Sequence, residues 1–155
     1  RDEVDRSGVG AQVVASFAGV IAMPADHHLT RLAAVTPGDL SGVPLIGLTP
    51  EDRARHRFDA ALIQEGVTPD YIIETPNSST ICALALSGDA VGLVNPLATE
   101  GFVERGLILR QFRPKIAFKS LLLFRPDNQR ATLVQSFTKG LFELRNSITI
   151  PDSEA

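Results

Sequence analysis

Residues 77–96 read NSSTICALALSGDAVGLVNP, and this stretch predicts the fold class of the chain. Its first four residues are types that cap the start of a helix. The apolar run at 81–86 predicts a helix that ends at Gly88, and because this run is apolar on every side we expect it to be largely buried. Ala90–Val94 predicts a strand that Asn95-Pro96 ends. A helix that leads directly into an apolar strand is typical of an α/β protein.

The same alternation of strands and helices continues on both sides of this stretch. Apolar segments predict further strands, at 13–23, 43–48, 70–74, 107–112 and 116–124. Further helices are predicted after Thr49 as N-cap, at 97–104, and after Asp127 near the end of the chain. Nearly continuous apolar strands separated by helices predict a mostly parallel sheet with helices on both faces. The fold class is therefore predicted to be α/β.

Length and composition limit the function classes that the chain can belong to. With 155 residues and 44% hydrophobic residues, the chain is expected to form one domain or two small lobes. A net charge of -3 argues against a protein that binds nucleic acid by itself. The longest uncharged apolar stretch, 12–25, is too short for a membrane span, so we expect a cytoplasmic protein without a membrane partner. Because the chain begins with Arg1, we expect it to be part of a longer protein.

Several reactive residues have a structural explanation that we favour over a chemical one. Asp26-His27-His28 lacks a third nearby metal ligand, so a polar loop is favoured over a metal site. Cys82 lies in an apolar helix and is expected to be a core residue. The basic run 105–130 contains interleaved phenylalanines, a pattern that is also found in proteins that bind single-stranded nucleic acid. A charged sheet edge or a subunit contact is favoured over this function. We therefore expect no catalytic residue, no metal and no cofactor.

Polar residues follow three of the predicted strands at the point where each strand ends. They are Thr49-Pro50, Thr75 to Ser79, and Asn95-Pro96. In open parallel sheets, ligands bind beyond the carboxyl ends of the strands. Helix N-termini there offer free N–H donors, and hydroxyl and amide side chains add more. For each residue alone an ordinary cap is favoured, but three such ends facing one crevice favour a small anionic ligand.

Two motifs resemble those of the LysR-type transcriptional regulators. Residues 20–29, VIAMPADHHL, are similar to the hydrophobic strand followed by Pro-x-x-His-x-Leu of that family, and 36–46 continues the likeness. Residues 81–96 resemble the family's helix, Gly, strand and Pro pattern. Cys82 and Asn95-Pro96 look most like the branch that senses amino acids and opines. The resemblance covers roughly residues 13–145.

The resemblance implies an effector-binding domain with the type 2 periplasmic-binding-protein fold, in which two α/β lobes enclose a ligand crevice. It implies that residues 1–19 are the last part of an incomplete first lobe together with the crossover strand, and that residues 20–124 form the second lobe. Residues 125–148 would form a C-terminal helix that belongs to the first lobe again, and residues 149–155 would be a tail. DNA binding would belong to an N-terminal winged helix-turn-helix outside this chain. The family also implies a homo-oligomer.

The effector-binding residues that the resemblance implies come from the three strand ends and from the hinge. They are Thr49, Pro50, Asp52, Arg53, Thr75, Asn77, Ser78, Asn95, Pro96 and, near the hinge, Phe17. Asp52 would bind an amino group of the ligand. The N–H groups and hydroxyls would bind a carboxylate, and Arg53 would be a second carboxylate-binding group. The implied function is to sense a small carboxylate or an amino-acid-like ligand. The alternatives are a solute-binding protein of a transport system and a small α/β enzyme.

Overall fold

The computed structural model describes residues 3–4, 10–125 and 132–145. The chain divides into two compact units, of which unit 1 comprises residues 1–17 and 119–155 and unit 2 comprises residues 18–118. The predicted Asp127 cap and the tail from residue 149 lie outside the described residues. The predicted lobe boundaries, after residues 19 and 124, stay a prediction.

Unit 2 contains six strands that form one run of neighbours. They are β3 (Val20–Met23), β4 (Ala34–Val35), β5 (Pro44–Leu48), β6 (Asp70–Thr75), β7 (Gly92–Val94) and β8 (Ile108–Phe112). β4, β8, β3 and β7 are paired in that order, β5 pairs with β6, and a parallel bridge between Leu45 and Val91 joins the two groups. β3 is antiparallel to both β7 and β8, whereas the other pairs are parallel. Five strands therefore run in one direction and only β3 runs against them.

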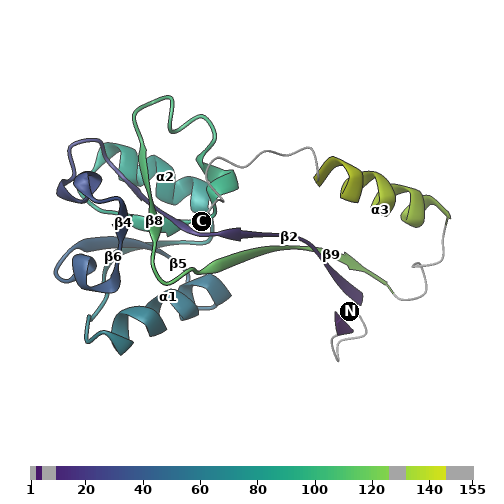
Figure 1. The fold of residues 1–155 in the computed structure, drawn as a ribbon, viewed down its shortest axis with the longest axis horizontal. Helices are drawn as coiled ribbons and strands as arrows, with labels where there is room; N and C mark the ends of the chain where they lie inside the picture. Colours follow the sequence, from purple (N-terminus) through teal and green to yellow (C-terminus); the bar gives the residue numbers. More distant parts are fainter. Residues whose placement is uncertain (1–2, 5–9, 126–131, 146–155) are drawn as a thin grey trace. The chain divides into compact units, whose positions relative to one another are not determined.

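Two α-helices cover opposite faces of these strands (Figure 1): α1 spans Arg53–Gln64 and α2 spans Ser78–Ser87. The core below α1 includes Leu45 and Leu93, whereas the core below α2 includes Ile46 and Val94. Because successive side chains of a strand point to opposite faces, this alternation places the two helices on opposite sides of the sheet. The predicted α/β class with helices on both faces is confirmed.

Strand β6, at the edge of the sheet, and one side of helix α2 are more exposed to solvent than the sequence predicts. β6 has a neighbour on one side only, and its Ile72 and Ile73 are 57% and 40% exposed. Helix α2 buries Ile81, Cys82 and Ala85 but exposes its opposite side. The prediction that α2 is buried over most of its surface is therefore wrong, because the helix packs on one face of the sheet.

Three 3-10 helices complete unit 2: η1 (His28–Arg31), η2 (Pro37–Leu40) and η3 (Pro96–Thr99). The short helix predicted at 97–104 is only this last 3-10 turn followed by further turns. The single strand predicted at 13–23 is two strands, because Gly19 separates β2 (Gly10–Ala18) from β3. A Cβ atom at Gly19 would lie 2.8 Å from the ring of Phe118 and 3.0 Å from the side chain of Leu93, so a larger residue at this break would have to displace these side chains.

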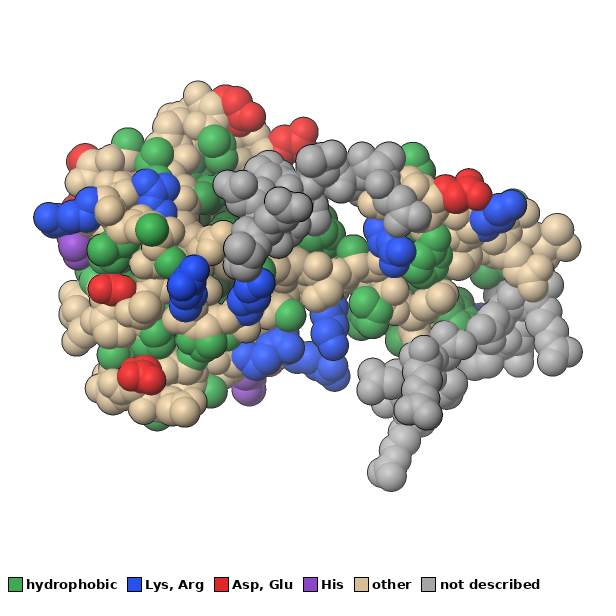
Figure 2. All heavy atoms as spheres, in the orientation of Figure 1, with side chains coloured by type: hydrophobic (Ala, Val, Ile, Leu, Met, Phe, Trp, Pro, Cys, Tyr) green, Lys and Arg blue, Asp and Glu red, His purple; other side chains and the backbone are tan. Residues whose placement is uncertain are grey.

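Unit 1 contains a three-stranded sheet and one helix. The sheet has the order β1-β2-β9, with β1 at Glu3–Val4 and β9 at Ala117–Phe124, and the helix α3 spans Thr132–Arg145. No described residue of α3 is buried, and Leu133 and Phe137 are among its exposed apolar side chains. Figure 2 shows hydrophobic side chains at the surface in this part of the chain. Residues of β9 and α3 line an apolar cleft of about 470 Å³.

The N-cap of α1 is Asp52, not Thr49 as predicted. The Asp52 carboxylate accepts hydrogen bonds from the N–H groups of Ala54 at 2.7 Å and of Arg55 at 3.1 Å. Thr49 instead accepts the Asp52 N–H with its backbone carbonyl, in a turn that precedes the helix. A carboxylate that serves two N–H groups next to the positive end of the helix dipole is a better cap than a threonine one turn earlier.

Replacing Asp52 by alanine is expected to lower the free energy of unfolding by about 1 kcal/mol, the usual cost of losing a helix cap. Thr49→Ala is the matched control, and it should change the free energy of unfolding by less than about 0.5 kcal/mol because its side chain caps nothing. Urea unfolding followed by circular dichroism measures both values. A larger loss for Thr49→Ala than for Asp52→Ala would contradict the observed cap.

Candidate functional site

The carboxyl ends of β5, β6 and β7 lie at the same edge of unit 2. β5 pairs in parallel with β6 on one side and, through the bridge at Leu45, with the segment that enters β7 on the other. Parallel neighbours end at the same edge of a sheet, so the residues after these strands lie next to one another. We call this edge the carboxyl edge. It contains Thr49, Thr75 and Asn95, which end or follow the three strands.

A hydrogen bond joins two of these strand ends directly. The Oγ of Ser78 accepts the N–H of Asn95 at 3.1 Å, which ties the start of α2 to the end of β7. Ser78 is buried, and its hydroxyl proton stays available for a second bond. The predicted proximity of Ser78 and Asn95 is therefore present in the structure.

Asn77 caps α2, as the sequence predicts. Its Oδ1 accepts the Thr80 N–H at 2.9 Å and the Thr80 hydroxyl at 2.7 Å. The N–H groups of the first turn have no partner within a helix, so those of Ser78 and Ser79 remain as donors at this terminus. Asn95 uses its own Oδ1 to accept the Leu97 N–H at the start of η3. Both side chains thus hold the backbone around the carboxyl edge with their oxygen atoms.

The remaining predicted residues of unit 2 differ in how far they are exposed. Thr75 is 6% exposed and belongs to the core at the end of β6. Thr49 and Asp52 are half-buried, whereas Pro50 and Arg53 are exposed. One carboxylate oxygen of Asp52 is committed to the helix cap, which leaves only its second oxygen for a ligand amino group.

Two predicted residues need separate comment. Pro96 is the first residue of η3 and half-buried, so it shapes the backbone after β7. Phe17 is 7% exposed and lies in the part of β2 that belongs to unit 1, whereas the other candidates belong to unit 2. The role of Phe17 in effector binding stays a prediction.

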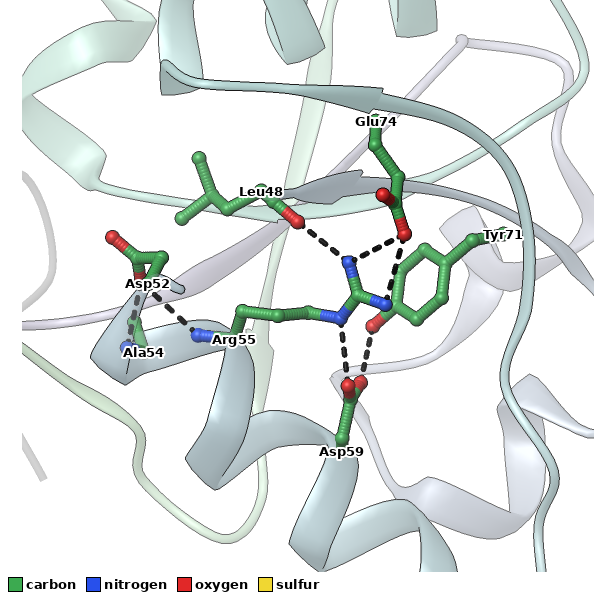
Figure 3. Close-up of polar contacts among 7 residues, drawn as sticks. All are labelled: Leu48, Asp52, Ala54, Arg55, Asp59, Tyr71 and Glu74. Atoms are coloured by element: carbon green, nitrogen blue, oxygen red, sulfur yellow. Dashed lines mark hydrogen bonds and ion pairs between the residues drawn. The ribbon is translucent and has the colours of Figure 1, made fainter. Parts of the chain in front are cut away.

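An ion cluster around the buried Arg55, next to the carboxyl edge, was not predicted from the sequence. It consists of Arg55 and Asp59 of α1 with Tyr71 and Glu74 of β6, and we call it the Arg55 cluster (Figure 3). The spacing of Arg55 and Asp59, one helical turn apart, is a sequence signal for an ion pair. Nothing local to the sequence signals that Glu74 completes it. The neighbouring His56 and Arg57 are exposed.

The two adjacent histidines lie in the polar loop after β3, where His27 caps η1. Nδ1 of His27 accepts the Leu29 N–H at 3.3 Å at the start of η1, and its ring stacks on that of His28. Partial burial, followed by the neighbouring His28, lowers the pKa of His27, although Asp26 and Asp89 oppose this shift. Asp26, His27, His28 and Asp89 line an open cleft of about 400 Å³. Across the described residues, no group of three or more His, Cys, Asp or Glu side chains could hold a metal ion.

Cys82 is a core residue, as predicted. Its side chain is fully buried in α2, and this burial raises the pKa of the thiol from 9.0 to about 11. A raised pKa is the opposite of what a nucleophilic cysteine needs.

Within the described part of the chain, no helix is long and apolar enough to span a membrane.

The Cys82 thiol is expected to resist modification by Ellman's reagent at pH 8 in the folded chain and to react at once after unfolding in guanidinium chloride. Because the folded pKa is raised, the protonated thiol stabilises the fold below pH 9, and this contribution is lost as the pH rises through about 11. Absorbance at 412 nm counts the reacted thiol. Rapid modification of the native chain would contradict the burial.

Comparison with known proteins identifies the family. The family model of the LysR substrate binding domain matches residues 1–143. The regulatory protein NocR of Agrobacterium tumefaciens is 30% identical over 139 residues, which are 90% of this chain and 46% of NocR. The transcriptional activator protein LysR of Escherichia coli is 29% identical over 122 residues, which are 79% of this chain and 39% of that protein. The chain thus spans less than half the length of these relatives.

Solved structures of the same family have a similar fold. The regulatory domain of CcmR from Synechocystis, solved in complex with 2-PG, superposes with a TM-score of 0.75 at 14% identity, over 96% of this chain and 73% of that one. HinK, a LysR family transcriptional regulator from Pseudomonas aeruginosa, gives a TM-score of 0.72 at 15% identity, over 94% of this chain and 51% of that one. These neighbours have the type 2 periplasmic-binding-protein-like α/β fold, as predicted. The chain belongs to the LysR substrate-binding domain family.

Proposed function

We propose that this chain is the effector-binding part of a bacterial LysR-type transcription regulator. The observation that carries the proposal is the carboxyl edge, where three parallel strands end side by side and Ser78 is bonded to Asn95. Ligands of open α/β sheets bind at this edge. The family match and the regulators among the relatives support the same function.

The ligand that we propose is a small carboxylate or an amino-acid-like molecule. The N–H groups of Ser78 and Ser79 and the Ser78 hydroxyl are donors suited to a carboxylate at a helix N-terminus. The free oxygen of Asp52 suits an ammonium group, and Arg53 supplies a positive charge to a second carboxylate. Thr49, Pro50, Thr75, Asn77, Asn95, Pro96 and Phe17 complete the proposed set.

In this proposal the ligand changes transcription by favouring one arrangement of the protein over another. A ligand that binds one arrangement more tightly shifts the population toward it, and it can shift no further than its difference in affinity allows. DNA binding would come from an N-terminal winged helix-turn-helix in the same cytoplasmic protein, which we propose to be a homo-oligomer.

The 155-residue chain alone should therefore give no mobility shift with operator DNA in a gel. A tight, salt-sensitive shift would contradict the proposal that the N-terminal domain binds the DNA.

A thermal-shift screen of the full-length protein against amino acids, opines and simple organic acids tests the proposed sensor. A ligand at 100 times its dissociation constant stabilises a folded protein by about 2.7 kcal/mol, which should raise Tm by several degrees. Ser78→Ala should reduce or abolish the shift. Ser87→Ala is the matched control, because Ser87 lies at the other end of the same helix and its hydroxyl bonds only to carbonyls of α2.

Two results would count against the proposal. No shift with any compound, in a protein shown to be folded, would remove the support for a carboxylate or amino-acid sensor. A shift that Ser78→Ala and Ser87→Ala affect equally would place the ligand away from the carboxyl edge.

A further inference from the structure

Arg55 is a buried arginine that binds three acceptors at once (Figure 3). It is 8% exposed. Its Nη1 donates to the backbone carbonyl of Leu48 at 2.5 Å, and its Nε donates to Oδ2 of Asp59 at 2.7 Å. Both Nη1 and Nη2 donate to Oε1 of Glu74 at 3.2 Å. The guanidinium therefore connects α1, the end of β5 and the end of β6.

The planar guanidinium is also contacted on one face by an aromatic ring. The ring of Tyr71 lies 3.4 Å from the guanidinium carbon, and the Tyr71 hydroxyl donates to Oδ1 of Asp59 at 2.6 Å. Gly47 allows this stack to sit close to β5, because a Cβ atom there would lie 2.5 Å from the Tyr71 ring and 2.7 Å from Nη1 of Arg55. The cavity beside the cluster holds only about 10 Å³. The Arg55 cluster is thus closely packed.

Two carboxylates, of Asp59 and Glu74, surround the single guanidinium of the cluster. Burial alone would disfavour the charged guanidinium, but the hydrogen bonds and charges from Asp59, Tyr71 and Glu74 outweigh it and raise the pKa of Arg55. Burial and the bond to Asp59 raise the pKa of Tyr71 well above its usual range. Arg55 is therefore charged and Tyr71 protonated at neutral pH, and the hydrogen bonds that Arg55 donates are charge-assisted.

Two of the three acceptors of Arg55 directly precede residues proposed to bind the effector. Leu48 is the last residue of β5 and directly precedes Thr49, whereas Glu74 directly precedes Thr75 at the end of β6. The backbone N–H of Arg55 is itself bound by the cap Asp52. One side chain thus holds two strand ends, and its backbone holds the loop between β5 and α1.

We propose that Arg55 is a positioning residue that fixes the separation and orientation of the two strand ends carrying Thr49 and Thr75. Its part in effector binding rests on the proposed function, but its action on the backbone does not. Lysine at this position has a single ammonium group and cannot reproduce the planar fork that reaches Leu48, Asp59 and Glu74 together. Arg55→Lys should therefore loosen both strand ends while keeping the charge.

Hydrogen exchange of the ligand-free chain, followed by mass spectrometry, tests this positioning without an effector. In Arg55→Lys we expect at least tenfold faster exchange at the amides of 49–52 and of 75–78, with much smaller changes elsewhere in unit 2. A residue with a merely structural role would accelerate exchange through the whole core by one common factor. Tyr71→Phe, which loses the bond to Asp59 but keeps the ring, should give a smaller change at the same amides.

Arg110→Lys is the matched control, because Arg110 is a second arginine of unit 2 that binds backbone carbonyls. Its guanidinium donates to the carbonyls of Thr30 and Leu32, beyond the carboxyl end of the antiparallel β3 and so at the opposite edge of the sheet. This variant should accelerate exchange around 30–32 and leave the carboxyl edge unchanged. Should Arg55→Lys fail to fold, Glu74→Gln removes one charge and should loosen 75–78 more than 49–52.

Unchanged exchange at 49–52 and 75–78 in a folded Arg55→Lys variant would overturn the proposal, as would a uniform increase over the whole core. For any compound that binds the wild-type full-length protein, Arg55→Lys should raise Kd at least tenfold and Arg110→Lys less than twofold. A wild-type protein that binds no compound would count against the proposed function alone, because the exchange result stands without a ligand.

Discussion

Gly92→Ala is expected to lower the free energy of unfolding by about 3 kcal/mol, at the upper end of the usual cost of overpacking a core. A Cβ atom at this position would lie 2.5 Å from the carbonyl oxygen of Ile46 in β5 and 2.5 Å from Cγ2 of Ile81 in α2. The backbone of β5 cannot yield without disturbing its pairing with β6. The variant should therefore also separate Asn95 from Ser78 and weaken binding at the carboxyl edge.

Gly38→Ala is the matched control for this substitution. A Cβ atom at Gly38, in η2, meets no atom within 4 Å, and this glycine does not have a positive φ. Alanine there should leave stability unchanged or raise it slightly by restricting the unfolded chain. Urea unfolding followed by circular dichroism compares the two variants, and equal stabilities would contradict the tight approach of β5, β7 and α2.

Phe58→Ala is expected to cost about 3–5 kcal/mol, the range for removing a phenylalanine from a core. Phe58 and Leu62 are the large apolar residues with which α1 packs on the sheet, and Phe58 is 2% exposed. Its ring meets that of Phe112 edge to face, with 4.9 Å between the centroids. Losing this contact should detach α1 from the sheet and with it the cap and loop that carry Asp52 and Thr49.

Ile63→Ala on the same helix separates this packing effect from a general effect on α1. Ile63 is 64% exposed, so its truncation should change the free energy of unfolding by less than about 0.5 kcal/mol. Thermal unfolding of both variants provides the measurement. A loss for Ile63→Ala as large as that for Phe58→Ala would show that the described core does not carry the stability of unit 2.

Local signals in the sequence predicted most elements of unit 2 but not the start of α1. The cap of α2 by Asn77 was predictable, because the cap and the helix lie within a few residues of each other. At α1 the sequence offers two capping residues three positions apart, Thr49 and Asp52. Pro50 favoured the first, but the chain makes a turn there before the helix begins at Arg53.

Long-range contacts account for what the sequence did not predict. Arg55 looks like one more charge of a solvated helix face, and its burial depends on Leu48 and Glu74, which are 7 and 19 residues away. The exposure of Ile72 and Ile73 follows from the position of β6 at the end of the strand order, which pattern alone does not reveal. The shared edge of the three strand ends was predicted better, because the ends of parallel strands lie at one edge whatever the order of the strands. The binding of a ligand there stays a prediction.

Hydrogen exchange of the full-length protein, with and without the compound that gives the largest thermal shift, tests the proposed site most directly. We predict slower exchange at the amides of 49–53, 75–79 and 95–97 in wild-type protein, and loss of this protection in Ser78→Ala. The cleft beside His27 and His28 serves as the internal reference and should not change. Protection at that cleft, with none at the carboxyl edge, would contradict the proposed effector site.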